Sequence, residues 1–174
     1  MNNKPKILYE KYKELVFNVA LHYTQNIEDA EEITQDVFIS IFENIKDFRE
    51  ESTLKTWAYR ITINKSLDFL KSKKRLKRIF FFKSLKIDDQ EKKISISEIN
   101  HPGVILENKE SVNAIFNCIN KLPPKLKTVI ILLKIEEKSQ KETAKIMQLS
   151  VKAIESLFHR AKKKLSIILK DNER

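Results

Sequence analysis

Cationic side chains offer the clearest chemistry in this sequence, because they gather in two separate blocks. The chain of 174 residues has a formal net charge of +10, and residues 60–83 and 121–174 each contribute +8. Residues 84–120, which lie between the blocks, carry −2, and residues 1–59 carry −4. This distribution indicates two contacts with a polyanion rather than one diffuse basic surface.

The opposite charge concentrates in one short segment. Between Ile27 and Glu51 there are nine acidic residues and only two basic ones, Lys46 and Arg49, so this segment has a net charge of −7. Carboxylates at the start of a helix favour its positive end, which explains Glu28 and Asp29 but not the later Asp36. An acidic patch of this kind does not suit a surface that lies on DNA, so it favours a protein partner.

The elements that position these charges are predicted to be helices. The sequence has one Gly and four Pro, whereas a many-stranded sheet needs tight turns that rely on Gly. Apolar residues recur every three or four positions through residues 7–23 and 30–42, which predicts two amphipathic helices, the second capped by Asn26. A third helix is predicted to begin after a cap at Ser52 or Thr53 and to become progressively basic.

A linker is predicted at residues 79–106, where the helical period is lost and the only Gly follows Pro102. We interpret Phe80, Phe81 and Phe82 as a cap over the end of the third helix, with an anchor for a partner as the alternative. The fold class is therefore all-α: two small helical domains, residues 1–78 and 107–174, joined by a flexible linker.

The C-terminal domain is predicted to contain a helix-turn-helix. A helix ends before Pro123 and Pro124, and Ser139 with Glu142 forms a capping box for a short helix. A turn at residues 148–150 precedes a longer basic helix. Three positions carry the motif: Ala144 where the helices cross, Gln148 in the tight turn, and the aliphatic Ile154. A glycine is usual in the turn, so Gln148 is expected to cost roughly 1 kcal/mol there.

The second helix of this motif has an exposed face suited to DNA. Val151, Ile154, Leu157 or Phe158, and Ala161 are expected to face inward. The remaining side chains offer cations for phosphates and polar groups for base edges. The alternative is an ordinary solvated helix with a basic tail.

Three ordered motifs resemble the sigma factors of bacterial RNA polymerase. Residues 29–38 are similar to the helix that binds core polymerase. Residues 54–61, with Asn64 and Asp68, are similar to the helix that reads and melts the minus-ten element. Residues 122–125, with the helix-turn-helix, are similar to the domain that binds the minus-thirty-five element. The two-domain organisation resembles the extracytoplasmic-function (ECF) subfamily. The resemblance implies transcription initiation: binding of core RNA polymerase and sequence-specific recognition and melting of promoter DNA.

The resemblance also implies roles for individual residues. Those expected to bind polymerase are Glu32, Gln35 and Asp36. Those expected to bind DNA at the minus-ten element are Arg60, Asn64, Lys65, Lys71, Lys74 and Arg75, with the preceding loop, Phe48 to Thr53. Those expected to bind DNA at the minus-thirty-five element are Ser150, Lys152, Ala153, Glu155, Ser156, His159, Arg160 and Lys163. Glu155 and Leu157 stand where the family often has basic residues, and Glu155 can accept a hydrogen bond from a cytosine amine. Trp57 falls in register with core residues and is interpreted as core.

Other features limit the range of functions. The single Cys118 lacks a CxxC partner, is interpreted as buried, and gives no metal site; no cofactor and no small-molecule substrate are implied. The N-terminal residues do not resemble a signal sequence and no segment is long enough to span a membrane, so a cytoplasmic, non-membrane protein is expected. The family commonly has an anti-sigma partner, which we also expect here.

Three alternatives remain at this stage. A helix-turn-helix regulator that acts without polymerase leaves the acidic second helix unexplained. A metal-dependent nuclease needs clustered acidic residues, but the first basic block contains only Asp68, so we expect no enzyme. A helical adaptor without DNA binding is the third.

Overall fold

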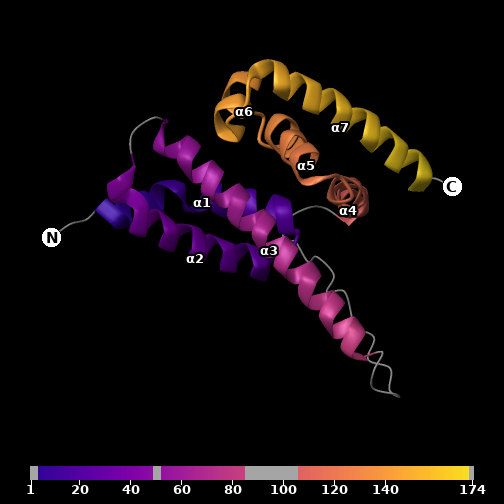
Figure 1. Cartoon of the computed structure of the whole chain (residues 1–174), viewed down its shortest axis with the longest axis horizontal. Coiled ribbons are helices and arrows are strands. Elements are labelled where there is room, and N and C mark those ends of the chain that lie inside the picture. The colour runs from indigo at the N-terminus through magenta and orange to yellow at the C-terminus, as the bar shows by residue number, and fades with distance from the viewer. Residues whose placement is uncertain (1–3, 49–51, 85–105, 173–174) are drawn as a thin grey trace.

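The computed structural model describes residues 4–48, 52–84 and 106–172, and every regular element within these ranges is a helix. The first group comprises α1 (Lys4–Thr24), α2 (Ile27–Asn44), a short 3-10 turn η1 (Ile45–Asp47) and α3 (Leu54–Ser84). The second comprises α4 (Leu106–Asn120), α5 (Pro124–Ile130), a π-helical segment η2 (Ile131–Ile135), α6 (Gln140–Met147) and α7 (Val151–Asn172). Figure 1 shows the second group against one side of α3. The all-α prediction is confirmed.

Local side-chain caps begin the helices of the first group where the sequence predicts them. The Asn26 side chain accepts a hydrogen bond from the Asp29 backbone N–H at 2.7 Å and starts α2. The Thr53 hydroxyl accepts one from the Thr56 N–H at 3.2 Å, immediately before α3. These caps satisfy amides that have no partner within their own helix.

The three helices of the first group enclose a small apolar core. Its buried members are Val16, Ala20, Leu21, Ala30, Ile33, Val37, Phe38, Ile41 and Ala58. Trp57 packs against this core, and its ring centroid lies 5.2 Å from that of Phe48. Trp57 is thus a packing residue, as predicted.

Helix α3 is longer than the sequence pattern suggests, because it continues to Ser84. The side chains of Phe80 and Phe81 are each 63% exposed. Phe80 and Phe81 therefore lie within the helix with exposed side chains, so their interpretation as a cap over its end is wrong, and the Phe82 side chain lies outside the described residues. Residues 71–84 contain no Gly or Pro to end the helix. Leu76, Ile79 and Phe80 share one face of the helix, but their side chains are exposed in the structure.

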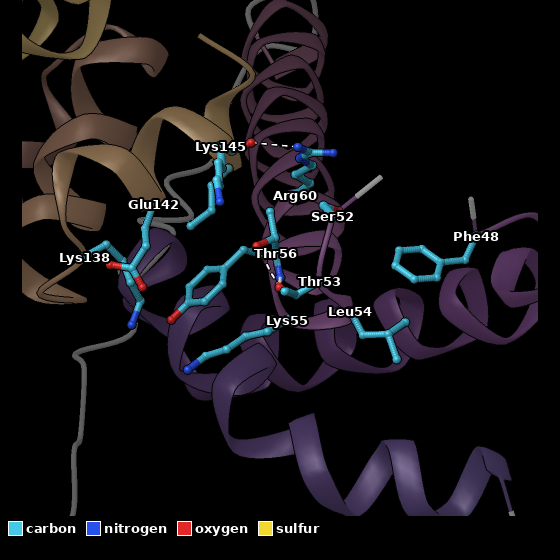
Figure 2. Close-up of a pocket in the computed structure, with 12 residues that line it drawn as sticks. Phe48, Ser52, Thr53, Leu54, Lys55, Thr56, Arg60, Lys138, Glu142 and Lys145 are labelled. Atoms are coloured by element: carbon cyan, nitrogen blue, oxygen red, sulfur yellow. Dashed lines mark hydrogen bonds between the residues drawn. The ribbon is translucent and has the colours of Figure 1, made fainter. Parts of the chain in front are cut away.

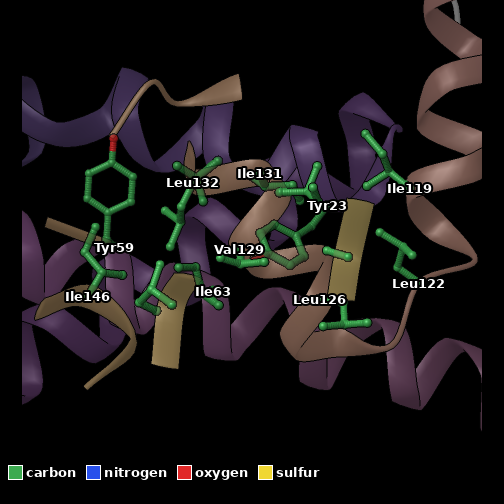
Figure 3. Close-up of a cluster of buried hydrophobic side chains, with 14 of the residues drawn as sticks. Tyr23, Tyr59, Ile63, Ile119, Leu122, Leu126, Val129, Ile131, Leu132 and Ile146 are labelled. Carbon is green, nitrogen blue, oxygen red and sulfur yellow. The ribbon is translucent and has the colours of Figure 1, made fainter. Parts of the chain in front are cut away.

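A second apolar core joins the two groups of helices. Val19 and Tyr23 of α1 and Tyr59 and Ile63 of α3 belong to the same buried cluster as residues of the second group. Figure 3 shows this cluster, to which the second group contributes Ile119, Leu122, Leu126, Val129, Ile131, Leu132 and Ile146. The two groups are thus packed directly against each other.

Candidate nucleic-acid interface

The helix-turn-helix is formed by α6, a three-residue turn and α7. The capping box is complete: the Glu142 N–H donates to the Ser139 hydroxyl at 3.2 Å, and the Ser139 N–H donates to the Glu142 carboxylate at 2.9 Å. The Ser139 hydroxyl also donates to the Glu142 carboxylate at 2.7 Å, and this bond, the bond from the Ser139 N–H and the charges of Lys138 and Lys55 lower the pKa of Glu142. The first turn of α6 is therefore fixed by its own sequence.

The turn between the helices has the left-handed conformation expected from the motif. Gln148 has φ 54° and ψ 46°, and the Leu149 N–H donates to the Ala144 carbonyl at 3.0 Å to close the turn. A side chain at this φ brings Cβ close to the carbonyl oxygen. Ala144 is 6% exposed and Ile154 is fully buried, as the helix crossing requires.

A Gln148→Gly variant is therefore expected to raise the free energy of unfolding by about 1 kcal/mol. Urea denaturation followed by circular dichroism measures the change. Gln148→Ala is the matched control, since it removes the same amide but keeps Cβ. An equal gain in both variants would contradict strain at this turn.

Helix α7 separates its apolar and polar residues as predicted except at Val151, for which the expected inward position is wrong because it lies in the exposed first turn. Ile154 and Ala161 are completely buried, and Leu157 and Phe158 pack partly buried against the same core, whereas Val151 is 36% exposed. Seven of the candidate residues are exposed: Ser150, Lys152, Glu155, Ser156, His159, Arg160 and Lys163. Ala153 is half-buried, and its N–H donates to the Ser150 hydroxyl at 3.2 Å, which caps α7. The helix thus presents its N-terminal turns, with their exposed polar groups, away from the core.

The candidate minus-ten residues do not form one surface on α3. Lys71, Lys74 and Arg75 are exposed along its distal half. Arg60 instead contacts the helix-turn-helix: its Nη2 donates to the Lys145 carbonyl at 2.7 Å, and its buried Nε has no hydrogen-bond partner among the described residues. Asn64 and Arg60 both line a crevice of about 270 Å³ against Pro124, Lys125 and the turn at Gln148 and Leu149.

The candidate polymerase residues share the outer face of α2. Glu32, Gln35 and Asp36 are all exposed and follow the i, i+3, i+4 spacing of one helix face. Lys65, expected at DNA, lies instead beside this face, with its Nζ 3.9 Å from the Asp36 carboxylate. Lys73 of α3 forms an ion pair with Asp29 of α2. The acidic and basic surfaces of the first group therefore adjoin each other.

A cavity of about 720 Å³ opens where the loop before α3 meets α6. Figure 2 shows Ser52, Thr53 and Arg60 around it, with Lys138, Glu142 and Lys145 from the second group. The part of the candidate minus-ten loop at residues 49–51 lies outside the described residues. The loop and the start of α3 therefore line the same cavity as residues of the helix-turn-helix.

Sequence reasoning missed the polar residues that join the two groups of helices. Glu136 directly follows η2. Its carboxylate accepts a hydrogen bond from the Tyr59 hydroxyl at 2.7 Å and lies 2.8 Å from His22 Nδ1. Burial raises the pKa of Glu136, but its hydrogen bonds to His22 and Tyr59 and the nearby charges outweigh burial, so the pKa is lowered overall. Burial and the hydrogen bond to Glu136 raise the pKa of Tyr59. Glu136 is thus a carboxylate held by two side chains of the first group.

Two further contacts cross the same boundary. The Tyr23 hydroxyl donates to the Thr128 hydroxyl at 2.8 Å, and burial raises the pKa of Tyr23. Lys127 Nζ donates to the Tyr23 carbonyl at 2.9 Å and, within the second group, to Asn120 Oδ1 at 2.6 Å. Residues this far apart in the chain leave no local pattern that identifies them.

Comparison with known proteins decides the family. Residues 8–76 match Sigma-70 region 2, and residues 113–165 match Sigma-70, region 4. The ECF RNA polymerase sigma factor SigW of Bacillus subtilis is 30% identical over 164 residues, which cover 92% of this chain and 86% of SigW. The chain belongs to the ECF family of RNA polymerase sigma factors. The ECF sigma-E factor of Haemophilus influenzae is 26% identical, over 90% of this chain and 82% of its own length.

Solved structures agree with the fold of an ECF sigma factor. RpoE of Bartonella quintana, in complex with the anti-sigma factor NepR, superposes with a TM-score of 0.63 at 20% identity, covering 97% of this chain and 98% of RpoE. CnrH, in complex with the cytosolic domain of CnrY, gives 0.65 at 22% identity, covering 98% of this chain and 90% of CnrH. Across the part of the ECF chain that the structure describes, no helix has the length and apolar character to cross a membrane.

Proposed function

We propose that this ECF sigma factor divides promoter recognition between α3 and α7 and binds core RNA polymerase through the outer face of α2. Membership of the family makes it a promoter-recognising factor for transcription initiation. In this proposal the functional units are residues 1–78 and 107–174, joined by residues 79–106. The protein acts in the cytoplasm, without catalytic activity of its own.

The observation that carries the proposal is the exposed N-terminal half of α7. Its apolar residues hold the helix on the core, so the opposite face is free to enter a major groove, as in other helix-turn-helix proteins. Lys152, Arg160 and Lys163 supply phosphate contacts, while Glu155, Ser156 and His159 supply groups for base edges. This face is assigned to the minus-thirty-five element.

The minus-ten element is assigned to α3 and the loop before it. Melting requires that a base leave the stack and enter a pocket, at a cost of a few kcal/mol. The hydroxyls and cations around the 720 Å³ cavity, together with Asn64 on the next turn, offer hydrogen bonds for an extruded base and its phosphates. Lys71, Lys74 and Arg75 continue the cationic surface along the helix.

The face of α2 that carries Glu32, Gln35 and Asp36 is assigned to core polymerase. These side chains are exposed, and the neighbouring apolar residues Ile33 and Val37 are buried. An anti-sigma protein is proposed as a further partner, because RpoE of Bartonella quintana, a sigma factor of similar fold, is in complex with the anti-sigma factor NepR.

Run-off transcription with core polymerase on a library of promoters tests the proposal. The wild-type protein is expected to give discrete start sites, and Asn64→Ala is expected to reduce the yield about ten- to hundredfold, as loss of one specific base contact does. Asn117→Ala, an exposed amide on α4, is the matched control and should keep full yield.

Polymerase binding is measured separately, by co-purification with core enzyme. Asp36→Lys is expected to weaken binding to core, whereas Asn64→Ala should leave it unchanged. If active core enzyme gave no discrete product with any promoter, the proposed function would be wrong. Equal loss in Asn64→Ala and Asn117→Ala would contradict only the assignment of Asn64.

A further inference from the structure

The distal part of α3 presents apolar side chains to solvent. Leu76, Ile79 and Phe80 are each more than half exposed, and neither apolar core of the described residues includes them. One turn earlier, Lys73 forms an ion pair with Asp29 in the first turn of α2, so α3 passes the start of α2 before Leu76. Figure 1 shows this end of α3 projecting beyond the other helices. An apolar surface in this position is accessible to a partner.

These three side chains share one face of the helix. They follow the i, i+3, i+4 spacing, and we name Leu76, Ile79 and Phe80 the distal stripe. Ala58 and Phe69 lie about five and two full turns before Leu76, so they are on the same side of α3, where they pack in the core of the first group. The distal stripe therefore continues the inner face of α3 beyond the end of that core.

Cationic side chains surround the distal stripe. Six of the eight residues from Lys71 to Arg78 are Lys or Arg, and positions 69–87 contain no acidic residue. Arg75 and Lys77 border the stripe, each about 100° round the helix from Leu76. An apolar stripe with cations along its borders is typical of helices that lie in the interface of an anionic lipid membrane.

Promoter DNA does not account for the distal stripe. Lys71 and Lys74, which are assigned to the minus-ten element, lie about 140° and 160° round the helix from Leu76, on the opposite side. A duplex bound on that side contacts the cations but leaves the stripe in water. Apolar side chains gain free energy only by leaving water, so the stripe requires a partner with an apolar interior.

We propose that α3 from Lys71 to Phe81 is a peripheral membrane-binding surface, which lies on anionic phospholipid without crossing the bilayer. A bilayer presents phosphates on every side of an inserted stripe, which matches cations on both borders, whereas a protein groove has to supply carboxylates at fixed positions. Each cation near an anionic membrane strengthens binding about fivefold. The stripe enters the boundary between headgroups and acyl chains, while Arg75 and Lys77 keep their charges among the headgroups.

Vesicle flotation of the full-length chain tests the proposal. Vesicles of phosphatidylcholine with about 30% phosphatidylglycerol are compared with vesicles of phosphatidylcholine alone. The wild type is expected to float with the anionic vesicles and not with the neutral ones. Added salt should weaken the binding, because it screens the attraction between the cations and the phosphates.

A double variant, Ile79→Gln with Phe80→Gln, makes the distal stripe polar and keeps every cation. Binding to the anionic vesicles is expected to fall about ten- to hundredfold, because two side chains no longer transfer into an apolar environment. Ile167→Gln with Leu169→Gln is the matched control on α7, since Ile167 is 54% exposed and Ile79 is 53% exposed. The control should bind as the wild type does, and circular dichroism verifies that both variants keep their helices.

Insertion of the stripe is measured separately from attraction by charge. Phe80→Trp places a fluorophore in the distal stripe, and its emission is expected to shift to the blue on anionic vesicles and to be quenched by brominated lipid. The wild type gives the background signal of Trp57, which packs against the core of the first group. An unshifted, unquenched emission on bound vesicles would contradict insertion.

Three other outcomes overturn the inference. The wild type could fail to float, or it could float equally with both kinds of vesicle. The stripe variant could bind anionic vesicles as tightly as the wild type. If that variant instead lost co-purification with core polymerase, the stripe would be a protein-docking surface. Lipid binding is measured without promoter DNA, so its failure leaves the proposed function to the transcription assay.

Discussion

The Ile154→Ala variant is expected to lose about 3 to 4 kcal/mol of unfolding free energy. Ile154 is completely buried and belongs to the joint core, where it holds α7 against α5 and α6. Removing three carbon atoms there leaves a cavity that the surrounding helices fill only in part, so the loss exceeds the transfer free energy of the atoms alone. Urea denaturation followed by circular dichroism measures the difference.

Two controls separate cavity formation from a general effect of substitution on α7. Ile154→Val removes one methyl group and is expected to cost about 0.5 to 1.5 kcal/mol. Ile167→Ala makes the same truncation on the same helix at a side chain that is 54% exposed, and should change stability by about 0.5 kcal/mol or less. Similar losses in Ile154→Ala and Ile167→Ala would contradict the position of Ile154 in the core.

The second large effect is a rise in stability with pH that depends on Lys127. Burial, with a smaller contribution from the Lys74 cation, lowers the pKa of Lys127 to about 8. In the unfolded chain the amine keeps its ordinary pKa of 10.5. Between these values the unfolded chain binds more protons than the folded one, so stability rises with pH. Conversely, the free energy of unfolding decreases as the pH is lowered from about 10.5 to about 8.

The expected gain is about 2 kcal/mol between about pH 7 and pH 9.5, since one pKa unit corresponds to about 1.4 kcal/mol. Denaturation at the two pH values measures it, and Lys127→Met should lose this gain because the titrating group is gone. Lys125→Met, on the same helix but exposed, should keep it. Equal pH dependence in the two variants would show that Lys127 is not the group responsible.

Local interactions explain why the positions of most helices could be predicted from the sequence. Asn26, Thr53 and the Ser139 capping box act within three residues of themselves, so their effect depends little on the rest of the chain. The turn at Gln148 was predicted for the same reason, even without the usual glycine. The buried state of Cys118, which is 2% exposed, followed from residue type alone.

Local sequence patterns could not predict where α3 ends or that η2 is π-helical. The helix continues past Arg78 because nothing in the sequence stops it, although the side chains of Ile79, Phe80 and Phe81 are exposed. The π-helical segment η2 has no sequence signature, and it directly precedes Glu136. Short π-helical segments of this kind are set by tertiary packing and often occur at functional positions.

The contacts between the two groups of helices could not be predicted for a different reason. Glu136 meets Tyr59 and His22 across 77 and 114 positions, and Tyr23 meets Thr128 across 105. Periodicity identifies which face of a helix is apolar but not which partner covers it. Arg60 and Asn64 were therefore assigned to DNA from the resemblance alone, while the structure places them against the helix-turn-helix.

The joint core also has a consequence for the order in which the protein is made. The N-terminal part of a chain emerges first during synthesis and begins to fold before the rest exists. Here α1 to α3 can close their own small core at once, whereas Tyr23, Tyr59 and Ile63 share the joint core with residues of the second group, the first of which is Phe116. The nascent protein therefore exposes part of the apolar surface of α1 and α3 until the second group has been translated.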